Sequence, residues 1–282
     1  MNGVTVLDGP MGTELARRGV PTPLHLWSAS AIDGCPEQIS RIHADYASAG
    51  ATVHTANTFR TDPWTLRKFG QEGRWEELTG RAVEIARQAV PEGHRVAGSL
   101  SPLEDCYRPD RTPDLQLCRK EHSRFARGLV EAGVDLILCE TFPHPGEALA
   151  ALDAALEHDL PVWLSLTQGP NGELMEEGVL VETLAEAARR GAEAVLVNCS
   201  PLATIQSALE RLAPLELTFG AYGNVGMPCP EQGWINPGDA DAASYSEAVR
   251  SWLATGATLV GGCCGTSTEH IAAISALVQG SP

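Results

Sequence analysis

The chain of 282 residues is 43% hydrophobic and 20% charged, which is ordinary for a globular enzyme and sufficient for a large core without disulfides. Its formal net charge of −16 argues against nucleic acids and membrane surfaces as partners, because both are negatively charged. The first ten residues carry no secretory signal, and no run approaches the roughly 18 apolar residues of a membrane span. We therefore expect a cytoplasmic protein whose eight cysteines are free, metal-bound or catalytic.

Short apolar runs alternate with longer helical patterns along the whole chain. The predicted strands cover 4–8, 51–59, 94–101, 134–142, 162–167, 194–200, 217–224 and 257–265. The predicted helices cover 36–49, 77–90, 115–132, 147–158, 181–190, 201–213, 242–254 and 268–278. Eight strand–helix units in succession predict an α/β fold, a (β/α)8 TIM barrel that residues 1–282 form as a single domain. A doubly wound open sheet is the alternative.

Two features at the ends of these units matter for the site. Glycines end several predicted helices, as in RRGAEAV and ATGATLV, where they supply the left-handed conformation of a helix C-terminus. Two long loops, 102–114 and 225–241, follow the third and seventh predicted strands. Because such barrels build their sites at the C-terminal ends of the strands, both loops are candidate lids.

Three cysteines fall at this same end of the predicted barrel. Cys263 and Cys264 lie in GGCCG at the end of the eighth strand, and Cys199 lies in VNCS at the end of the sixth. Three thiolates can bind Zn²⁺ and leave an open fourth position, which is typical of catalytic zinc. The flanking glycines let neighbouring residues turn sharply enough to share one ion. The alternatives are three small core residues or a disulfide between Cys263 and Cys264, which a reducing cytoplasm disfavours.

On these residues the chain resembles the homocysteine S-methyltransferase family, over essentially its whole length. The motifs that carry the resemblance are LDGPMGTEL (7–15), ANTFR (56–60), DLILCET (135–141), VNCS (197–200) and GGCCGT (261–266). The stretch LHLWSA (24–29) is most similar to the stand-alone enzymes that use S-methylmethionine. The resemblance implies a (β/α)8 barrel in which Cys199, Cys263 and Cys264 hold zinc.

The resemblance also implies a set of substrate-binding residues. Glu140 would hold the amino group of homocysteine, and Asp8 would be a second substrate-binding acid. Asn57, Thr141 and Asn224 complete the expected set, although Gly223 stands where family members often have proline before the asparagine. The betaine-dependent branch carries tyrosine directly after the glutamate, so Thr141 weakens a betaine reading. Without the resemblance, Asp8 is equally explained as a turn-forming residue before Gly9.

The chemistry fits this resemblance. A thiol with a pKa of roughly 8.5 is mostly protonated at neutral pH, and zinc stabilises the nucleophilic thiolate. A sulfonium donor leaves as a neutral thioether and needs no general acid. The predicted activity is therefore zinc-dependent methyl transfer from S-methylmethionine or S-adenosylmethionine to homocysteine, which gives methionine. A betaine-dependent enzyme and a methyltransferase for another thiol or for selenocysteine are alternatives.

Other interpretations of the same residues remain open. A phosphate-binding barrel would use the glycine-rich loops after the seventh and eighth strands and would not need thiols. A non-catalytic zinc or thiol sensor would use the thiols and not the two carboxylates. The histidines form neither HxH nor HExxH, which disfavours the histidine-rich zinc hydrolases. Cys139 is expected to pack away from the mouth, and Trp234 either anchors its loop or covers a sulfonium. The expected partners are small-molecule substrates; the sequence does not indicate an oligomeric state.

Overall fold

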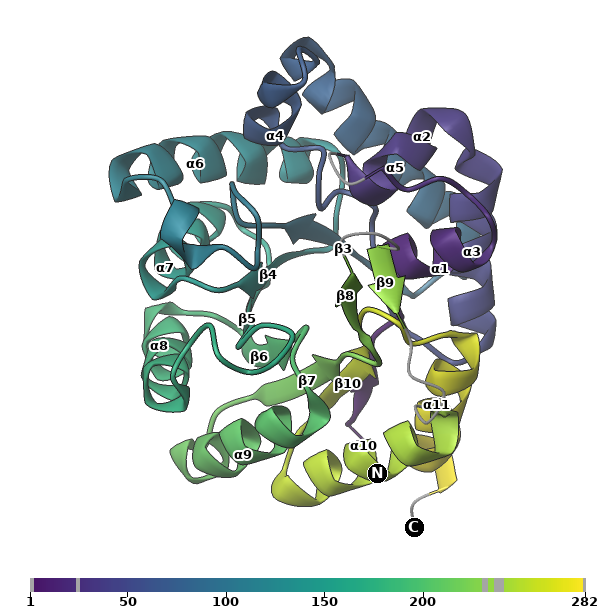
Figure 1. Ribbon diagram of the computed structural model, residues 1–282, viewed down its shortest axis with the longest axis vertical. Coiled ribbons are helices and arrows are strands. Elements are labelled where there is room, and N and C mark those ends of the chain that lie inside the picture. Colours follow the sequence, from purple (N-terminus) through teal and green to yellow (C-terminus); the bar gives the residue numbers. More distant parts are fainter. Residues whose placement is uncertain (1–2, 24–25, 230–232, 236–240, 281–282) are drawn as a thin grey trace.

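Eight parallel strands close into a barrel in the computed structural model, which describes residues 3–23, 26–229, 233–235 and 241–280 (Figure 1). The strands are β1 (Thr5–Val6), β2 (Val53–Thr55), β3 (Arg95–Leu100), β4 (Leu136–Phe142), β5 (Val162–Leu166), β6 (Ala194–Asn198), β7 (Phe219–Gly223) and β10 (Leu259–Gly262). Their order in the sheet is β1-β10-β7-β6-β5-β4-β3-β2. A single parallel bridge, between Leu7 and Val53, closes β1 against β2. The predicted (β/α)8 barrel is thereby confirmed.

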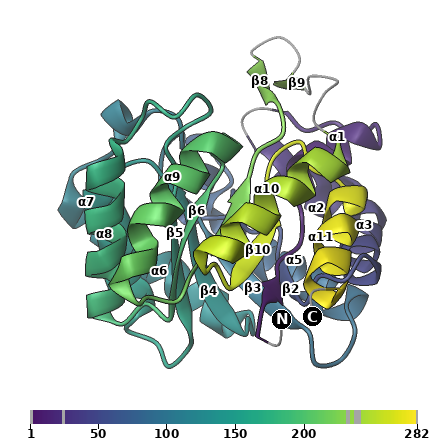
Figure 2. The same ribbon diagram turned by 90° about the horizontal axis from the view of Figure 1, so that it is seen from below.

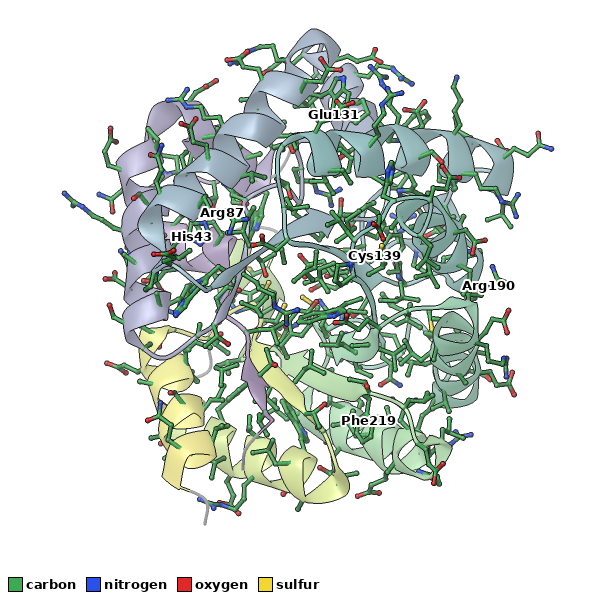
Figure 3. All side chains as sticks on the ribbon, turned by 180° about the vertical axis from the view of Figure 1, so that it is seen from behind. His43, Arg87, Glu131, Cys139, Arg190 and Phe219 are labelled. Carbon is green, nitrogen blue, oxygen red and sulfur yellow. The ribbon has the colours of Figure 1, made fainter. Side chains whose placement is uncertain are left out.

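Helices surround this barrel, and each predicted one is present. They are α3 (Pro36–Ser48), α5 (Trp75–Ala89), α6 (Leu115–Glu131), α7 (Pro145–Ala155), α8 (Glu177–Arg190), α9 (Leu202–Leu212), α10 (Ala242–Thr255) and α11 (Thr268–Gly280). Gly191 and Gly256 follow α8 and α10 with φ of 114° and 110°, so they end these helices in the predicted left-handed conformation. Charged side chains such as Arg87 and Arg190 lie on the outer surface, where they form ion pairs (Figure 3).

The core has two layers, as the buried parallel strands require. Side chains such as Leu138, Trp163 and Leu196 fill the inside of the barrel. A larger cluster lies between the strands and the helices. Cys139 belongs to this outer cluster, so its side chain points away from the barrel interior as predicted.

The loops at the strand ends contain elements that the sequence pattern does not predict. Three short helices, α1 (Met11–Arg17), α2 (Ala31–Gly34) and α4 (Pro63–Lys68), follow β1 and β2. The loop after β7 contains the hairpin strands β8 (Met227–Cys229) and β9 (Gly233–Ile235), which project beyond one end of the barrel (Figure 2). Most of that predicted loop, 230–232 and 236–240, lies outside the described residues, as do Leu24 and His25 of the LHLWSA stretch.

Several strands end earlier than predicted, and this changes the site. The second strand ends at Thr55, because Thr58 bonds back to the carbonyl of Ala56 and the chain leaves the sheet. The last strand ends at Gly262, so Cys263 and Cys264 lie in a turn after the strand. The expected site residues of both segments therefore belong to loops at the mouth.

Among the described residues, no helix is long and apolar enough to cross a membrane.

Candidate active site

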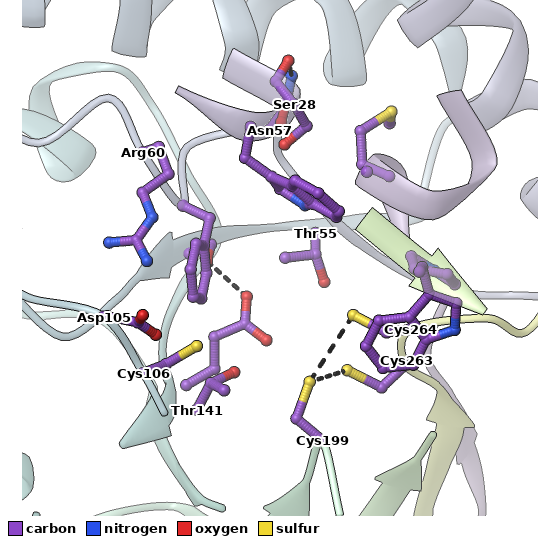
Figure 4. Close-up of a pocket in the computed structure, with 18 of the residues that line it drawn as sticks. Ser28, Thr55, Asn57, Arg60, Asp105, Cys106, Thr141, Cys199, Cys263 and Cys264 are labelled. Atoms are coloured by element: carbon purple, nitrogen blue, oxygen red, sulfur yellow. Dashed lines mark hydrogen bonds between the residues drawn. The ribbon is translucent and has the colours of Figure 1, made fainter. Parts of the chain in front are cut away.

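A cavity of about 700 Å³ opens at the C-terminal ends of the strands. Residues within or just after the C-terminal ends of β1, β2, β3, β4, β6, β7 and β10 line it together with residues of the β8–β9 hairpin. Seven of the eight predicted site residues line this cavity: Asp8, Asn57, Glu140, Thr141, Cys199, Cys263 and Cys264. Figure 4 shows the three cysteines together on one side and Arg60, Asp105 and Cys106 on the other.

The three cysteine sulfurs meet in one cluster. The Sγ atom of Cys199 lies 2.7 Å from that of Cys263 and 3.9 Å from that of Cys264 (Figure 4). Cys199 and Cys263 are buried, and Cys264 is partly exposed to the cavity. Cys199 has a φ of 48°, a conformation that is strained for a residue with a side chain and that directs it toward the pair.

This cluster fits a tetrahedral metal ion. Sulfur ligands at about 2.3 Å from zinc lie about 3.8 Å apart, which matches the Cys199–Cys264 distance. Binding an ion would require Cys199 and Cys263 to separate by about 1 Å. The thiol hydrogen bond with Cys263 raises the pKa of Cys199, the bond with Cys199 raises that of Cys264, and burial raises that of Cys263. A bound cation would provide the positive charge that these thiols need to ionise.

A second group of metal-ligand type is less suitable. Atoms of Asp8, His43 and His54 lie within 4.8 Å of one another, with 3.9 Å between His43 Nδ1 and Asp8 Oδ2. Ligands at about 2.1 Å from zinc would lie about 3.4 Å apart, so this group is too open. Neither histidine lines the cavity, and burial lowers the pKa of His43 to about 3 and of His54 to about 4. These histidines therefore remain neutral behind Asp8.

Helix α1 fixes the turn that carries the cysteine pair. The hydroxyl of Thr13 accepts a hydrogen bond of 3.0 Å from the main-chain N–H of Gly265. Arg17, which pairs with Glu14, donates to the carbonyls of Gly265 and Thr266 at 3.3 and 3.0 Å. We call these contacts of Thr13 and Arg17 the α1 clamp. They position Cys263 and Cys264 from a segment about 250 residues away in the sequence.

The glycines on either side of Cys263 and Cys264 do not all provide the sharp turn that the sequence predicts. Only Gly265, after the pair, has the left-handed conformation that allows a sharp turn, with a φ of 84°. Gly262 provides space instead, since a Cβ atom there would lie 2.2 Å from the hydroxyl oxygen of Thr266. That hydroxyl donates to the carbonyl of Cys263 at 2.8 Å, so the close approach supports the turn.

The two expected substrate acids are both buried. Asp8 accepts hydrogen bonds from the N–H and the hydroxyl of Thr55, at 2.9 and 3.1 Å. Glu140 accepts from the hydroxyls of Ser99 and Tyr222, at 2.5 and 2.9 Å. Burial raises the pKa of both acids above their usual values, although these hydrogen bonds oppose the shift. Neither carboxylate has an Arg or Lys partner among the described residues, so the two are suited to a cationic group of a ligand.

The remaining predicted residues differ in where they lie relative to the cavity. Thr141 lies in the cavity wall with a φ of 64°. Asn57 also lines the cavity, but its side chain donates to the carbonyl of Ser28 at 2.9 Å. Asn224 does not line the cavity; both polar atoms of its buried side chain lack hydrogen-bond partners among the described residues. Trp234 lines the cavity and also anchors its loop, through a 2.8 Å bond to the carbonyl of Val225.

Sequence reasoning missed the groups that hold these residues. Ser99, Tyr222 and Thr55 were not singled out, although each lies on a predicted strand. Their inward orientation follows from the alternation of side chains along a strand, which is the signal that could have identified them. The cavity residues Arg60, Asp105, Cys106 and Tyr107 come from loops, where no such periodicity exists.

Comparisons with known proteins identify the family of the chain. The profile of the family described as "Homocysteine S-methyltransferase" matches residues 5–278. The chain is 32% identical to the homocysteine S-methyltransferase of Escherichia coli K12, over 97% of this chain and 94% of the relative. It is 30% identical to the homocysteine S-methyltransferase YbgG of Bacillus subtilis, over 96% and 93%.

A solved structure shows the same likeness. The metallated form of the homocysteine methyltransferase MmuM from Escherichia coli superposes with a TM-score of 0.80 and 29% identity. The match covers 98% of this chain and 96% of that chain. Sequence and structure thus agree along the whole chain, and we conclude that it belongs to the homocysteine S-methyltransferase family and is an enzyme of that family.

Proposed function

We propose that this enzyme transfers a methyl group from a sulfonium donor, S-methylmethionine or S-adenosylmethionine, to the sulfur of L-homocysteine, and that Cys199, Cys263 and Cys264 hold the zinc ion required. The observation that carries the proposal is the cluster of three sulfurs at the edge of a cavity that also contains two buried carboxylates. The relatives' names and the metallated structure of MmuM support it.

The acceptor would bind between the cysteines and the carboxylates. Bound zinc would lower the pKa of the homocysteine thiol, so that its sulfur is ionised at neutral pH. Glu140 and Asp8 would hold the ammonium group of homocysteine through charge-assisted hydrogen bonds. Ser99 and Tyr222 keep the Glu140 carboxylate in place, and Thr55 does the same for Asp8. In this role the substrate cation offsets the cost of burying the two negative charges.

The donor would occupy the rest of the cavity. Phe59, Tyr107 and Trp234 line this space, and aromatic faces attract the positive charge of a sulfonium. The leaving group is a neutral thioether, so no acid is needed to protonate it. The contribution of the protein is alignment of the acceptor sulfur, the methyl carbon and the leaving sulfur. Thr141, in place of a tyrosine after Glu140, favours a sulfonium over betaine.

The test is direct. Zinc-loaded protein is incubated with L-homocysteine and, in turn, S-methylmethionine, S-adenosylmethionine and betaine, and methionine is measured. We expect methionine with a sulfonium donor and none with betaine. If the zinc-loaded protein forms no methionine with any of the three donors, the proposal is overturned and a zinc or thiol sensor is favoured. Methionine formed only from betaine would correct the donor.

A further inference from the structure

Two opposite charges line the same wall of the cavity without pairing with each other. Arg60, after β2, and Asp105, after β3, both face the cavity across from the three cysteines (Figure 4). Among the described residues, no carboxylate lies within 4.0 Å of the Arg60 guanidinium, and no basic side chain lies within 4.0 Å of the Asp105 carboxylate. Arg60 is partly buried and Asp105 is exposed at the edge of the cavity, so water or a ligand can reach both charged groups.

Two neighbouring charged residues of the same wall, by contrast, pair with each other. Lys68 and Glu104 line the same wall, and they form an ion pair of 2.6 Å. Glu104 also accepts a hydrogen bond of 2.9 Å from Trp64. The Lys68–Glu104 pair is therefore satisfied within the protein. Among the described residues, Arg60, Asp105 and Arg111 line the cavity without an ion pair, and Arg60 and Asp105 both lie across from the cysteines.

Both groups are held in position by contacts that leave their charged atoms available. The Arg60 guanidinium lies 5.0 Å from the centre of the Phe59 ring, and one of its nitrogens donates to the carbonyl of Glu104 at 3.2 Å. The carboxylate of Asp105 accepts one hydrogen bond, of 2.9 Å, from the N–H of Tyr107. Most of the arginine donors and one carboxylate oxygen therefore remain free of protein partners among the described residues.

We propose that Arg60 and Asp105 are the residues that bind the amino-acid end of the methyl donor, its α-carboxylate and α-ammonium groups. This inference rests on the proposed function and assigns the residues that recognise its donor. Arg60 would take the α-carboxylate through two parallel hydrogen bonds, and Asp105 would take the α-ammonium group. The ammonium group of the acceptor has Asp8 and Glu140 as partners in the same cavity, so it does not need Asp105. Whether Arg60 takes the carboxylate of the donor or of the acceptor is decided by the KM of homocysteine in the test below.

The test compares three sulfonium donors with three variants. The donors are S-methylmethionine, its analogue without the amino group, (3-carboxypropyl)dimethylsulfonium, and its analogue without the carboxylate, (3-aminopropyl)dimethylsulfonium. The variants are Arg60→Gln, Asp105→Asn and, as a control, Arg119→Gln, an exposed arginine of α6 outside the cavity. Zinc content and circular dichroism show whether each variant is folded and loaded.

Each substitution should matter only for the donor group that it contacts. Arg60→Gln should raise the KM of S-methylmethionine and of the carboxylate analogue at least about tenfold, and leave that of the amino analogue unchanged. Asp105→Asn should show the reverse pattern, and Arg60→Lys should restore part of the loss. The KM of homocysteine should not change. An equal loss with all three donors, or a raised KM of homocysteine instead, would overturn the assignment.

Calorimetry separates this inference from the proposed function. S-methylmethionine binding to zinc-loaded wild type and to Arg60→Gln is measured without turnover. One outcome is that the wild type binds the donor, that Arg60→Gln binds it more weakly, and that no methionine forms. The donor site then stands and the proposed reaction fails. If wild type forms methionine and both proteins bind the donor equally, the reaction stands and the donor site fails.

Discussion

The side chain of Asn198 holds Thr141 by two hydrogen bonds. Its Oδ1 atom accepts from the main-chain N–H of Thr141 at 3.1 Å, and its Nδ2 atom donates to the hydroxyl at 2.8 Å. Ser165 donates to the same Oδ1 atom at 2.7 Å. Thr141 follows Glu140 and Cys199 follows Asn198, and both have a positive φ. One buried amide thus supports the strained backbone beside a substrate carboxylate and beside a metal ligand.

Replacing Asn198 by alanine should damage both parts of the site. Three buried hydrogen bonds are lost, so the free energy of unfolding should fall by about 2–4 kcal/mol. Zinc affinity and homocysteine affinity should fall together, because Cys199 and Glu140 lose the same support. Chemical denaturation and a competitive zinc titration measure these effects. Asn171→Ala, an exposed asparagine, is the control, and a variant that loses only stability would contradict the link.

Replacing Glu140 by glutamine should separate stability from function. Burial raises the pKa of Glu140 above 4.5, so the folded protein disfavours the ionised form. Relative to the variant, the wild type therefore loses stability as the pH rises above 4.5, because the unfolded chain ionises Glu140 first. At pH 8 the variant should be more stable than the wild type, and this difference should vanish at acidic pH. Its affinity for homocysteine should nevertheless fall.

Thermal unfolding across pH and calorimetry with homocysteine measure the two effects. A Glu140→Gln variant that is less stable than the wild type at every pH would show that the Ser99 and Tyr222 hydrogen bonds outweigh the buried charge.

Removing one sulfur should remove the metal. In Cys264→Ser, the zinc-to-protein ratio after dialysis should fall from near one toward zero, because a hydroxyl is a poor zinc ligand. Cys139→Ala, which removes a buried thiol outside the cavity, should keep its zinc. Elemental analysis and cobalt absorption spectra are the measurements. An enzyme with unchanged zinc content and activity in Cys264→Ser would restore the phosphate-barrel alternative.

Loosening the α1 clamp should weaken the metal site without removing a ligand. Arg17→Met abolishes the hydrogen bonds to the carbonyls of Gly265 and Thr266. Zinc affinity should fall about 10- to 100-fold, which is typical when a group that orients metal ligands is lost. Arg127→Met, on the exposed face of α6, is the matched control. Equal zinc affinities in the two variants would show that the turn does not need the clamp.

The sequence predicts this fold well, for physical reasons. Eight repeats of strand and helix determine which residues lie at the mouth of a barrel, so Cys199 and Cys263 could be placed together although 64 positions separate them. The partners of Glu140 could not be predicted, because contacts of Ser99 and Tyr222 depend on the register of three strands. The α1 clamp was missed because a seven-residue helix gives too short a pattern. The position of Asn224 outside the cavity lining could not be predicted, because a motif does not show where a side chain points.

The bridge between Leu7 and Val53 has a further consequence for motion. Among the described residues, the main chains are joined there by two hydrogen bonds, from the N–H of Asp8 to Val53 and from the N–H of Thr52 to Val6, and Thr55 adds two to the Asp8 carboxylate. Asp8 lies at this contact between β1 and β2. Amide protons there should exchange with deuterium earlier than those of β4–β6, because local opening needs few bonds to break. A ligand cation held by Asp8 would then slow the local opening of the barrel between β1 and β2.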